Sequence, residues 1–210
     1  MSATSPTRQR VAARKYNYFD EQRANRLAGP VQISRDPADN PHQINSYRTF
    51  SGDVKAPTAS SQLEIVRDAV NIVAEEGPVL GHRIHEISQA VRSKHQMTKE
   101  FGRALNRALT LAVNAGELGA TNPLGESGVK PLTFILPGRQ QVDVRALGPR
   151  SLNQVPPAEL FELMGRIADA QMISGTELTL ATLGALGLDA RVTDSHRRLR
   201  EIVEGLGPFT

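Results

Sequence analysis

The stretch QLEIVRDAVNIVAEEGPVLGHRIHEISQAV, residues 62–91, decides the fold class of this chain. Apolar residues recur in it at spacings of three and four, first up to Gly77-Pro78 and then again beyond Gly81. This period places an apolar stripe along each of two helices, and the glycine and proline end the first of them. The stripe residues are Leu63, Val66, Val70 and Val73 in the first helix and Ile84, Ile87 and Val91 in the second.

A third helix and a hairpin are expected to follow. Thr98 can cap the helix, and Asn114-Ala115-Gly116 ends it. The segments 117–120 and 131–136 predict two short strands around the turn-rich loop TNPLGESG. With the short segment Pro78-Val79-Leu80 as a strand between the first two helices, the order is helix, strand, helix, helix, hairpin, which is typical of a winged-helix domain. The expected buried stripe of the third helix is Phe101, Leu105, Ala108, Leu109 and Ala112.

The same order returns in the C-terminal part of the chain. Sliding the sequence by 94 residues aligns Arg103 with Arg197, Leu105 with Leu199, and Gly81 with Gly175, which we interpret as an internal repeat. Because the sequence ends at Thr210, we expect this copy to lack a wing after its last helix. The helical stripe that opens the copy is Leu160, Leu163, Met164 and Ile167.

These patterns predict a mainly α protein with two consecutive winged-helix-like, helix-turn-helix units. The expected ranges are 61–137 for the first unit, 138–156 for a linker rich in Pro and Gly, and 157–210 for a trihelical, truncated second unit. Residues 1–60 lack a sustained apolar period and are expected to form a largely disordered basic arm. Arginines and aromatics interleave within residues 7–27, which suits an arm that folds against a partner or stacks on bases, or alternatively a solubilising tail.

The amino-acid composition bears on the kind of core and on the cellular compartment. Aromatic residues make up only 4% of the 210 residues and Trp is absent, so the core is expected to consist of aliphatic helices. Cysteine is absent, which excludes disulfides and thiolate metal sites and suits a reducing compartment. No apolar run approaches a membrane span and the N-terminus has no signal-peptide core, so a cytoplasmic protein without a membrane partner is expected.

The net charge of +3 permits nucleic-acid binding only if the cations gather on one face. The outward face of the third helix offers such a cluster. Arginine pairs with guanine and asparagine with adenine, so Arg103 and Asn106 are predicted base readers, whereas the other cations suit phosphate. A solvated helix face is the alternative. The predicted contacts of the first unit are Arg92, Lys94, Lys99, Arg103, Asn106 and Arg107.

The last helix carries a second group of candidates, Arg197, Arg198 and Arg200. Asp194, Glu201 and Glu204 are interspersed with them and would repel phosphate. Contact with DNA and an intramolecular network of ion pairs both remain open for this helix.

No pattern in the sequence points to catalysis. Walker A, G-x-G-x-x-G, G-x-S-x-G and H-E-x-x-H motifs are all missing. His82 and His85 have no further ligand at a recurring spacing, and we interpret them as exposed helix histidines. We therefore assign no catalytic residue, no metal and no cofactor.

Two pairs of segments carry a resemblance to a known family. They are AVNIVAEEGPVLGHRIHEISQAV with GRALNRALTLAVNAGEL, and PPAELFELMGRIADAQMISGTEL with LGLDARVTDSHRRLREIV. They resemble an uncharacterised tandem winged-helix-like domain found at the C-terminus of large bacterial proteins that fuse a superfamily-one helicase to a nuclease of the very-short-patch-repair type. SKHQMTKEFG departs from the usual basic approach to the third helix, and the helicase and nuclease parts are absent from this chain. The resemblance, over about residues 57–206, implies a DNA-associated accessory module.

The function expected from the sequence is binding of double-stranded DNA without catalysis. The protein would be a regulator, or an accessory factor of the nucleoid, of repair or of defence, located in the cytoplasm on the nucleoid. The alternative is an interaction module that docks its helical faces on a partner protein or on a second copy of the chain.

Overall fold

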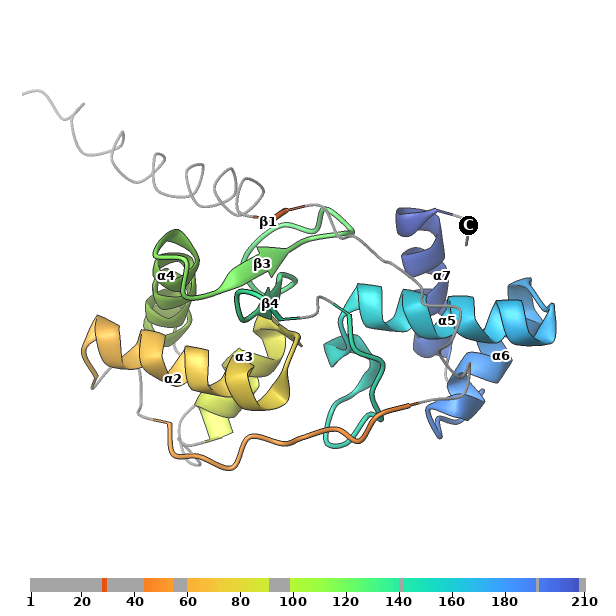
Figure 1. Ribbon diagram of the computed structural model, residues 1–210, viewed down its shortest axis with the longest axis horizontal. Helices are drawn as coiled ribbons and strands as arrows, with labels where there is room; N and C mark the ends of the chain where they lie inside the picture. Colours follow the sequence, from red (N-terminus) through yellow and green to blue (C-terminus); the bar gives the residue numbers. More distant parts are fainter. Residues whose placement is uncertain are drawn as a thin grey trace, which may run out of the picture.

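The helices of the chain form two groups, each around its own hydrophobic core (Figure 1). The computed structural model describes residues 28–29, 44–54, 60–90, 99–139, 142–191 and 193–207. Within these ranges the chain is mainly helical, with a small sheet attached to the first group. None of the helices described there is both long and apolar enough to cross a membrane.

The first unit contains α2 (Gln62–Glu76), α3 (Gly81–Ala90) and α4 (Lys99–Asn114). Ser61 and Glu64 cap α2 reciprocally: the Ser61 hydroxyl accepts the Glu64 N–H at 3.3 Å, and the Glu64 carboxylate accepts the Ser61 N–H at 2.9 Å. Gly77 ends α2 with a φ of 77°, a conformation that favours glycine. The helix therefore begins and ends where its local sequence satisfies the free backbone groups.

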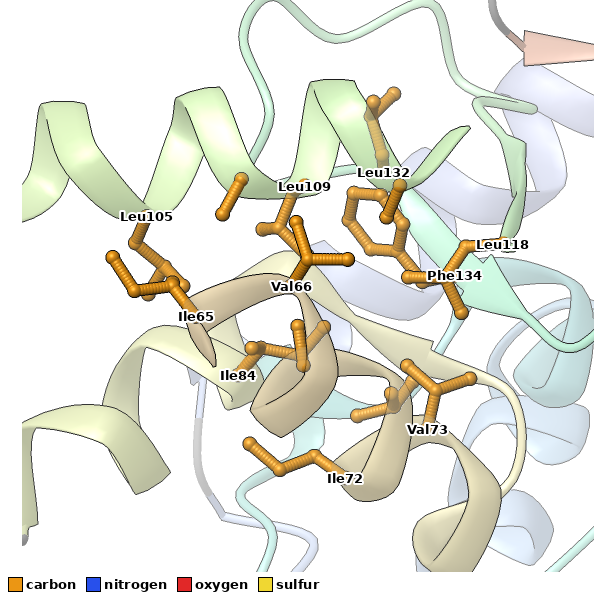
Figure 2. Close-up of a cluster of buried hydrophobic side chains, with 14 of the residues drawn as sticks. Ile65, Val66, Ile72, Val73, Ile84, Leu105, Leu109, Leu118, Leu132 and Phe134 are labelled. Carbon is orange, nitrogen blue, oxygen red and sulfur yellow. The ribbon is translucent and has the colours of Figure 1, made fainter. Parts of the chain in front are cut away.

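Packing of α2 against α4 forms the first core, with Phe134 and Leu132 closing one side (Figure 2). The predicted stripe of α4 is confirmed, since all five of its residues are buried. The predicted stripe of α2 is wrong at Leu63, which is 75% exposed. The side of α2 that faces the core is formed by six residues with the same helical period, and Leu63 lies outside this side. That set is Ile65, Val66, Ala69, Ile72, Val73 and Glu76.

The sheet of the first unit follows the predicted order of elements. It contains β2 (Val79–Leu80), β3 (Gly119–Thr121) and β4 (Thr133–Ile135), and β4 pairs antiparallel with both of the others. A further short strand, β1 (Ala28–Gly29), pairs parallel with β3 at the edge of this sheet. The hairpin between β3 and β4 carries residues 122–132, which we call the hairpin loop.

The second unit contains α5 (Pro157–Gln171), α6 (Gly175–Ala185) and α7 (Thr193–Leu206). All four residues of the predicted α5 stripe are buried. Gly81 and Gly175 begin α3 and α6, and Lys99 and Thr193 begin α4 and α7, so the helices repeat at the offset found in the sequence. Leu105 and Leu199, which the repeat aligns, are both buried.

Residues 138–156 differ from the predicted linker. Val144, Leu152 and Val155 are buried in the second core, and a short 3-10 helix, η2 (Leu152–Gln154), lies within the segment. Hydrophobic residues spaced among Pro and Gly supply this burial, so the described part of the segment belongs to the second unit.

The predicted disordered arm needs a similar correction at residues 44–54, which we call the strap. The strap runs in extended form along both units (Figure 1), and Val54 is buried in the first core. At its other end, Asn45 donates its N–H to the carbonyl of Val144 at 2.9 Å and accepts the N–H of Ala146. The rest of the arm, apart from β1, lies outside the described residues.

Buried charges join the two units and the strap. On the first unit, the Glu76 carboxylate accepts two hydrogen bonds from Arg83, at 3.0 and 3.1 Å, and one from the Tyr47 hydroxyl. On the second, the Glu159 carboxylate accepts hydrogen bonds from Arg145 and Arg150 at 2.7 to 3.0 Å. We call these charges the seam: Glu76, Arg83, Arg145, Arg150 and Glu159.

Arg145 connects the halves of the seam directly. Its guanidinium donates to the backbone carbonyls of Glu76 and Pro78 as well as to Glu159. The ring of Tyr47 lies against both seam arginines, with its centroid 5.3 Å from the Arg145 Cζ and 4.1 Å from the Arg150 Cζ. Each of these buried charged groups is therefore hydrogen bonded, and Arg145 makes the bonds that cross the boundary between the units.

Candidate nucleic-acid interface

The outward face of α4 carries three exposed cations on one line. Lys99, Arg103 and Arg107 are four residues apart along the helix, and all three are exposed. Residues at this spacing lie above one another on the same side of a helix. The opposite side of α4 is fully occupied by the first core, so the cations point away from the protein body.

These cations have no carboxylate partner among the residues that the structure describes. Glu100 is the single acidic residue of α4, and it forms no ion pair with Arg103 there. The acidic residues of the first unit gather instead on α2, which contains Glu64, Asp68, Glu75 and Glu76 against one arginine. The unit is neutral in sum but has its positive charge concentrated on α4.

Asn106 lies beside this line but is engaged inside the protein. Its side-chain oxygen lies 2.8 Å from the Nε2 of His85 on α3, and the residue is half-buried. A base-reading asparagine needs both its oxygen and its amide free for an adenine. The predicted role of Asn106 as a base reader is therefore not supported by its position.

His85 is buried, which corrects its interpretation as an exposed histidine. The pKa of His85 is lowered to about 4, mainly by burial; the hydrogen bond to Asn106 opposes this shift, and the nearby charges of Lys130 and His82 add to it. The imidazole is thus neutral at pH 7, and its Nε2–H donates to Asn106. This hydrogen bond fixes α3 against α4 from behind the cationic face.

The arginines of α7 are arranged differently. Arg197 lies 2.9 Å from Asp194 and 3.8 Å from Glu201, and Arg198 lies 3.6 Å from Glu126 of the hairpin loop. Arg200 is exposed and has no ion-pair partner among the described residues. The carboxylates therefore neutralise two of the three candidates on this helix, as expected for an intramolecular network.

The hairpin loop is docked on the second unit. Leu124 packs against the second core, and Glu126 pairs with Arg198 of α7. A Cβ atom at Gly205 of α7 would lie only 2.5 Å from the Leu124 Cδ2, so this glycine makes room for the leucine. The loop is thus held by the second unit on the side where a free wing would extend.

A cleft of about 260 Å3 lies between the hairpin loop, α3, η2 and α7. Its charged residues have both signs, with Lys130, Arg197 and Arg198 opposed by Glu126, Asp194 and Glu201. This balance does not suit a phosphate. Within the described ranges, no group of three or more His, Asp and Glu side chains is arranged to hold a metal.

Two predicted contacts, Arg92 and Lys94, lie outside the described residues. Of the others, the structure brings together Lys99, Arg103 and Arg107 on one exposed face, and it places Arg197, Arg198 and Arg200 on a separate helix at the other end of the molecule (Figure 1). Sequence reasoning missed the seam, because Arg145 and Arg150 stand in a segment interpreted as a linker.

Comparison of the chain with models of known families, with curated proteins and with solved structures finds no match. Function is therefore inferred from the geometry of α4 and from the order of the elements around it.

Proposed function

We propose that the chain is a non-catalytic protein that binds double-stranded DNA through the exposed face of α4. The first unit would be a winged-helix domain and the second a trihelical relative of it. The order helix, strand, helix, helix, hairpin supports this assignment, as does the pairing of the strand between the first two helices with the last strand. In such domains the third helix enters the major groove.

The observation that carries the proposal is the contrast between α4 and α7. The two helices are equivalent in the repeat, yet Lys99, Arg103 and Arg107 are free of carboxylates in the described structure, whereas Arg197 is paired twice. Unpaired cations release the counterions of DNA on binding, whereas a paired cation must first give up its carboxylate. We therefore assign the DNA contact to α4, with Arg200 outside it.

Fluorescence anisotropy with a labelled duplex and the full chain tests this assignment. The double charge reversal R103E/R107E is expected to weaken binding more than about tenfold at low salt, because two phosphate-binding cations become anions. R191E/R200E is a matched control, since it changes the net charge by the same amount at two exposed arginines of the second unit. Its affinity should stay within about threefold of the wild type.

The outcomes separate the alternatives. Loss of binding in R191E/R200E with retention in R103E/R107E would move the contact to the second unit. Equal loss of affinity in both variants would indicate that binding depends only on the overall charge of the protein. If the wild-type chain binds no duplex at low salt, the DNA proposal is wrong, and docking on a partner protein or on a second copy becomes the leading function.

The resemblance to the C-terminal domain of helicase and nuclease fusion proteins fits this proposal. It would make the chain an accessory factor of the nucleoid, of repair or of defence, with no enzymatic activity of its own. The charge and position of α4 support the DNA contact independently of the resemblance.

A further inference from the structure

We infer that α4 contacts the phosphates of the duplex and does not read its base sequence, so that the protein binds DNA without sequence preference. This inference rests on the proposed function and concerns the same face. Three features of the structure support it: the engaged amide, the unsupported arginines and the docked hairpin loop.

The first feature is that the amide and the hydroxyl that lie beside Arg103 and Arg107 on α4 are already engaged within the protein. Asn106 is hydrogen bonded to His85 at 2.8 Å, and the Thr110 hydroxyl donates to the backbone carbonyl of Asn106 at 2.9 Å. Leu111, further along, is 47% exposed and cannot hydrogen bond through its side chain. Beside Arg103 and Arg107, the groups that remain for contact are the cations and an aliphatic side chain, which cannot recognise adenine. The exposed amide of α4 is that of Asn114, at the last residue of the helix.

The second feature is the absence of support around the arginines. A guanidinium that reads guanine must hold its planar fork in the plane of the base. Neighbouring carboxylates can fix an arginine in this way, as Glu159 does for Arg150 with two hydrogen bonds of 3.0 Å. Arg103 and Arg107 have no such neighbour in the described part of the chain. Their guanidinium groups can therefore bind phosphates in many positions but have no fixed orientation toward a base.

The third feature is the docked hairpin loop. In a winged helix this loop can add contacts beside the recognition helix, but here Leu124 packs on the second core and Glu126 pairs with Arg198. The loop residue Lys130 lines the mixed-charge cleft next to these groups. Among the described residues, the first unit is therefore left with α4 as its contact, without a second element to fix a register on the bases.

Charge-conserving substitutions test the inference. In full-length R103K/R107K the cations remain but the planar fork is lost, whereas R103Q/R107Q removes both charges. We expect R103K/R107K to bind a mixed-sequence duplex within about threefold of the wild type, and R103Q/R107Q to lower the salt slope by about two. All four changes are at exposed positions, so the fold should be retained.

Competition by unlabelled duplexes provides the second readout. AT-rich, GC-rich and mixed duplexes of equal length should displace the labelled DNA from the wild type at concentrations within about threefold of one another. A duplex that competes more than about tenfold better, or a tenfold loss in R103K/R107K with binding otherwise intact, would overturn the inference and leave the proposed function standing. Absence of any binding by the wild type would instead overturn the proposed function and this inference with it.

Discussion

Gly81 begins α3 at a point where the backbone of the hairpin loop passes directly over it. A Cβ atom at this position would lie 2.4 Å from the Val129 carbonyl oxygen and 3.1 Å from the Lys130 Cα. Backbone atoms cannot move aside as a flexible side chain can. The repeated glycine thus allows the close contact between α3 and the hairpin in the first unit.

Gly81→Ala is therefore expected to lower the free energy of unfolding by about 1–3 kcal/mol, because the methyl group overpacks the site. Gly184→Ala is the matched control, since Gly184 lies in α6, where a Cβ atom would meet no neighbouring group within 4 Å. The control should be unchanged or more stable by about 0.5–1 kcal/mol. Urea denaturation of both variants measures the difference, and equal stabilities would disprove the close contact.

The buried His85 should make the free energy of unfolding depend on pH. Its pKa is about 4 in the folded chain and about 6.5 in the unfolded chain, so the unfolded state binds the extra proton between these values. The free energy of unfolding should therefore fall as the pH is lowered from 6.5 to 4, by up to about 1.4 kcal/mol per pH unit from this group.

His85→Gln keeps a donor for Asn106 but has no titrating group, so this part of the pH dependence should disappear. Urea denaturation at pH 7, 6, 5 and 4 measures it in both proteins. Parallel curves for wild type and variant would show that His85 does not titrate with a lowered pKa.

At the scale of elements, the segment 142–156 is held by one buried carboxylate. Glu159 accepts hydrogen bonds from the Arg145 N–H, the Arg145 guanidinium and the Arg150 guanidinium. Glu159→Gln leaves the buried Arg150 without a counter-charge and Arg145 with only the half-exposed Asp143 carboxylate at 3.9 Å, so the free energy of unfolding should drop by about 3 kcal/mol.

Asp194→Asn is the control for this prediction, because the pair of Asp194 with Arg197 is about 70% exposed on both sides. Its cost should be under about 1 kcal/mol. Chemical denaturation compares the two variants. A similar small loss in both would mean that Glu159 contributes no more than a surface ion pair.

The elements that the sequence predicted are those whose apolar residues follow one period. Phe101 to Ala112 and Leu160 to Ile167 could be placed because spacing alone reports a buried helix face. Leu63 was predicted to be buried but is exposed, since three or four apolar residues do not define accurately which side of a helix faces the core. Arg145, Arg150 and Glu76 could not be placed, because their partners are up to 69 positions away and a charged residue beside prolines resembles a solvated loop.

In the candidate site too, helical spacing predicts which residues share a face but not which contacts they make with other helices. The exposure of Lys99, Arg103 and Arg107 on one face could be predicted because helical spacing places them opposite a clear apolar stripe. Asn106 shares their face in a helical projection, but its hydrogen bond to His85 depends on how α3 packs on α4, which no pattern within α4 reports.

At the scale of the whole molecule, the seam should make the two units unfold together. Arg145 bonds to the carbonyls of Glu76 and Pro78 in the first unit and to Glu159 in the second. We expect the wild type to show a single calorimetric transition with equal calorimetric and van't Hoff enthalpies. Arg145→Ala should make the van't Hoff enthalpy smaller than the calorimetric enthalpy, since the direct hydrogen bonds from the second unit to Glu76 and Pro78 are lost while the hairpin loop and the strap still connect the units.

Arg166→Ala is the control for this experiment. Arg166 is partly buried and pairs with Glu162 on the same helix, so its replacement removes an ion pair that lies within one unit. Differential scanning calorimetry of the three proteins distinguishes the cases. One transition with matched enthalpies in Arg145→Ala would show that the seam does not couple the units.

The seam also has a consequence for the order in which the chain matures as it leaves the ribosome. All elements of the first core are synthesised once β4 has emerged, and Glu76 then has Arg83 and Tyr47 as partners. Arg145 and Arg150 emerge before Glu159, so neither arginine can pair with this carboxylate until α5 is synthesised. We therefore expect the end of the strap where Asn45 bonds to Val144 and Ala146 to dock only after α5 has begun to form. Although it is synthesised early, this end of the strap would then be among the last parts of the nascent protein to become protected.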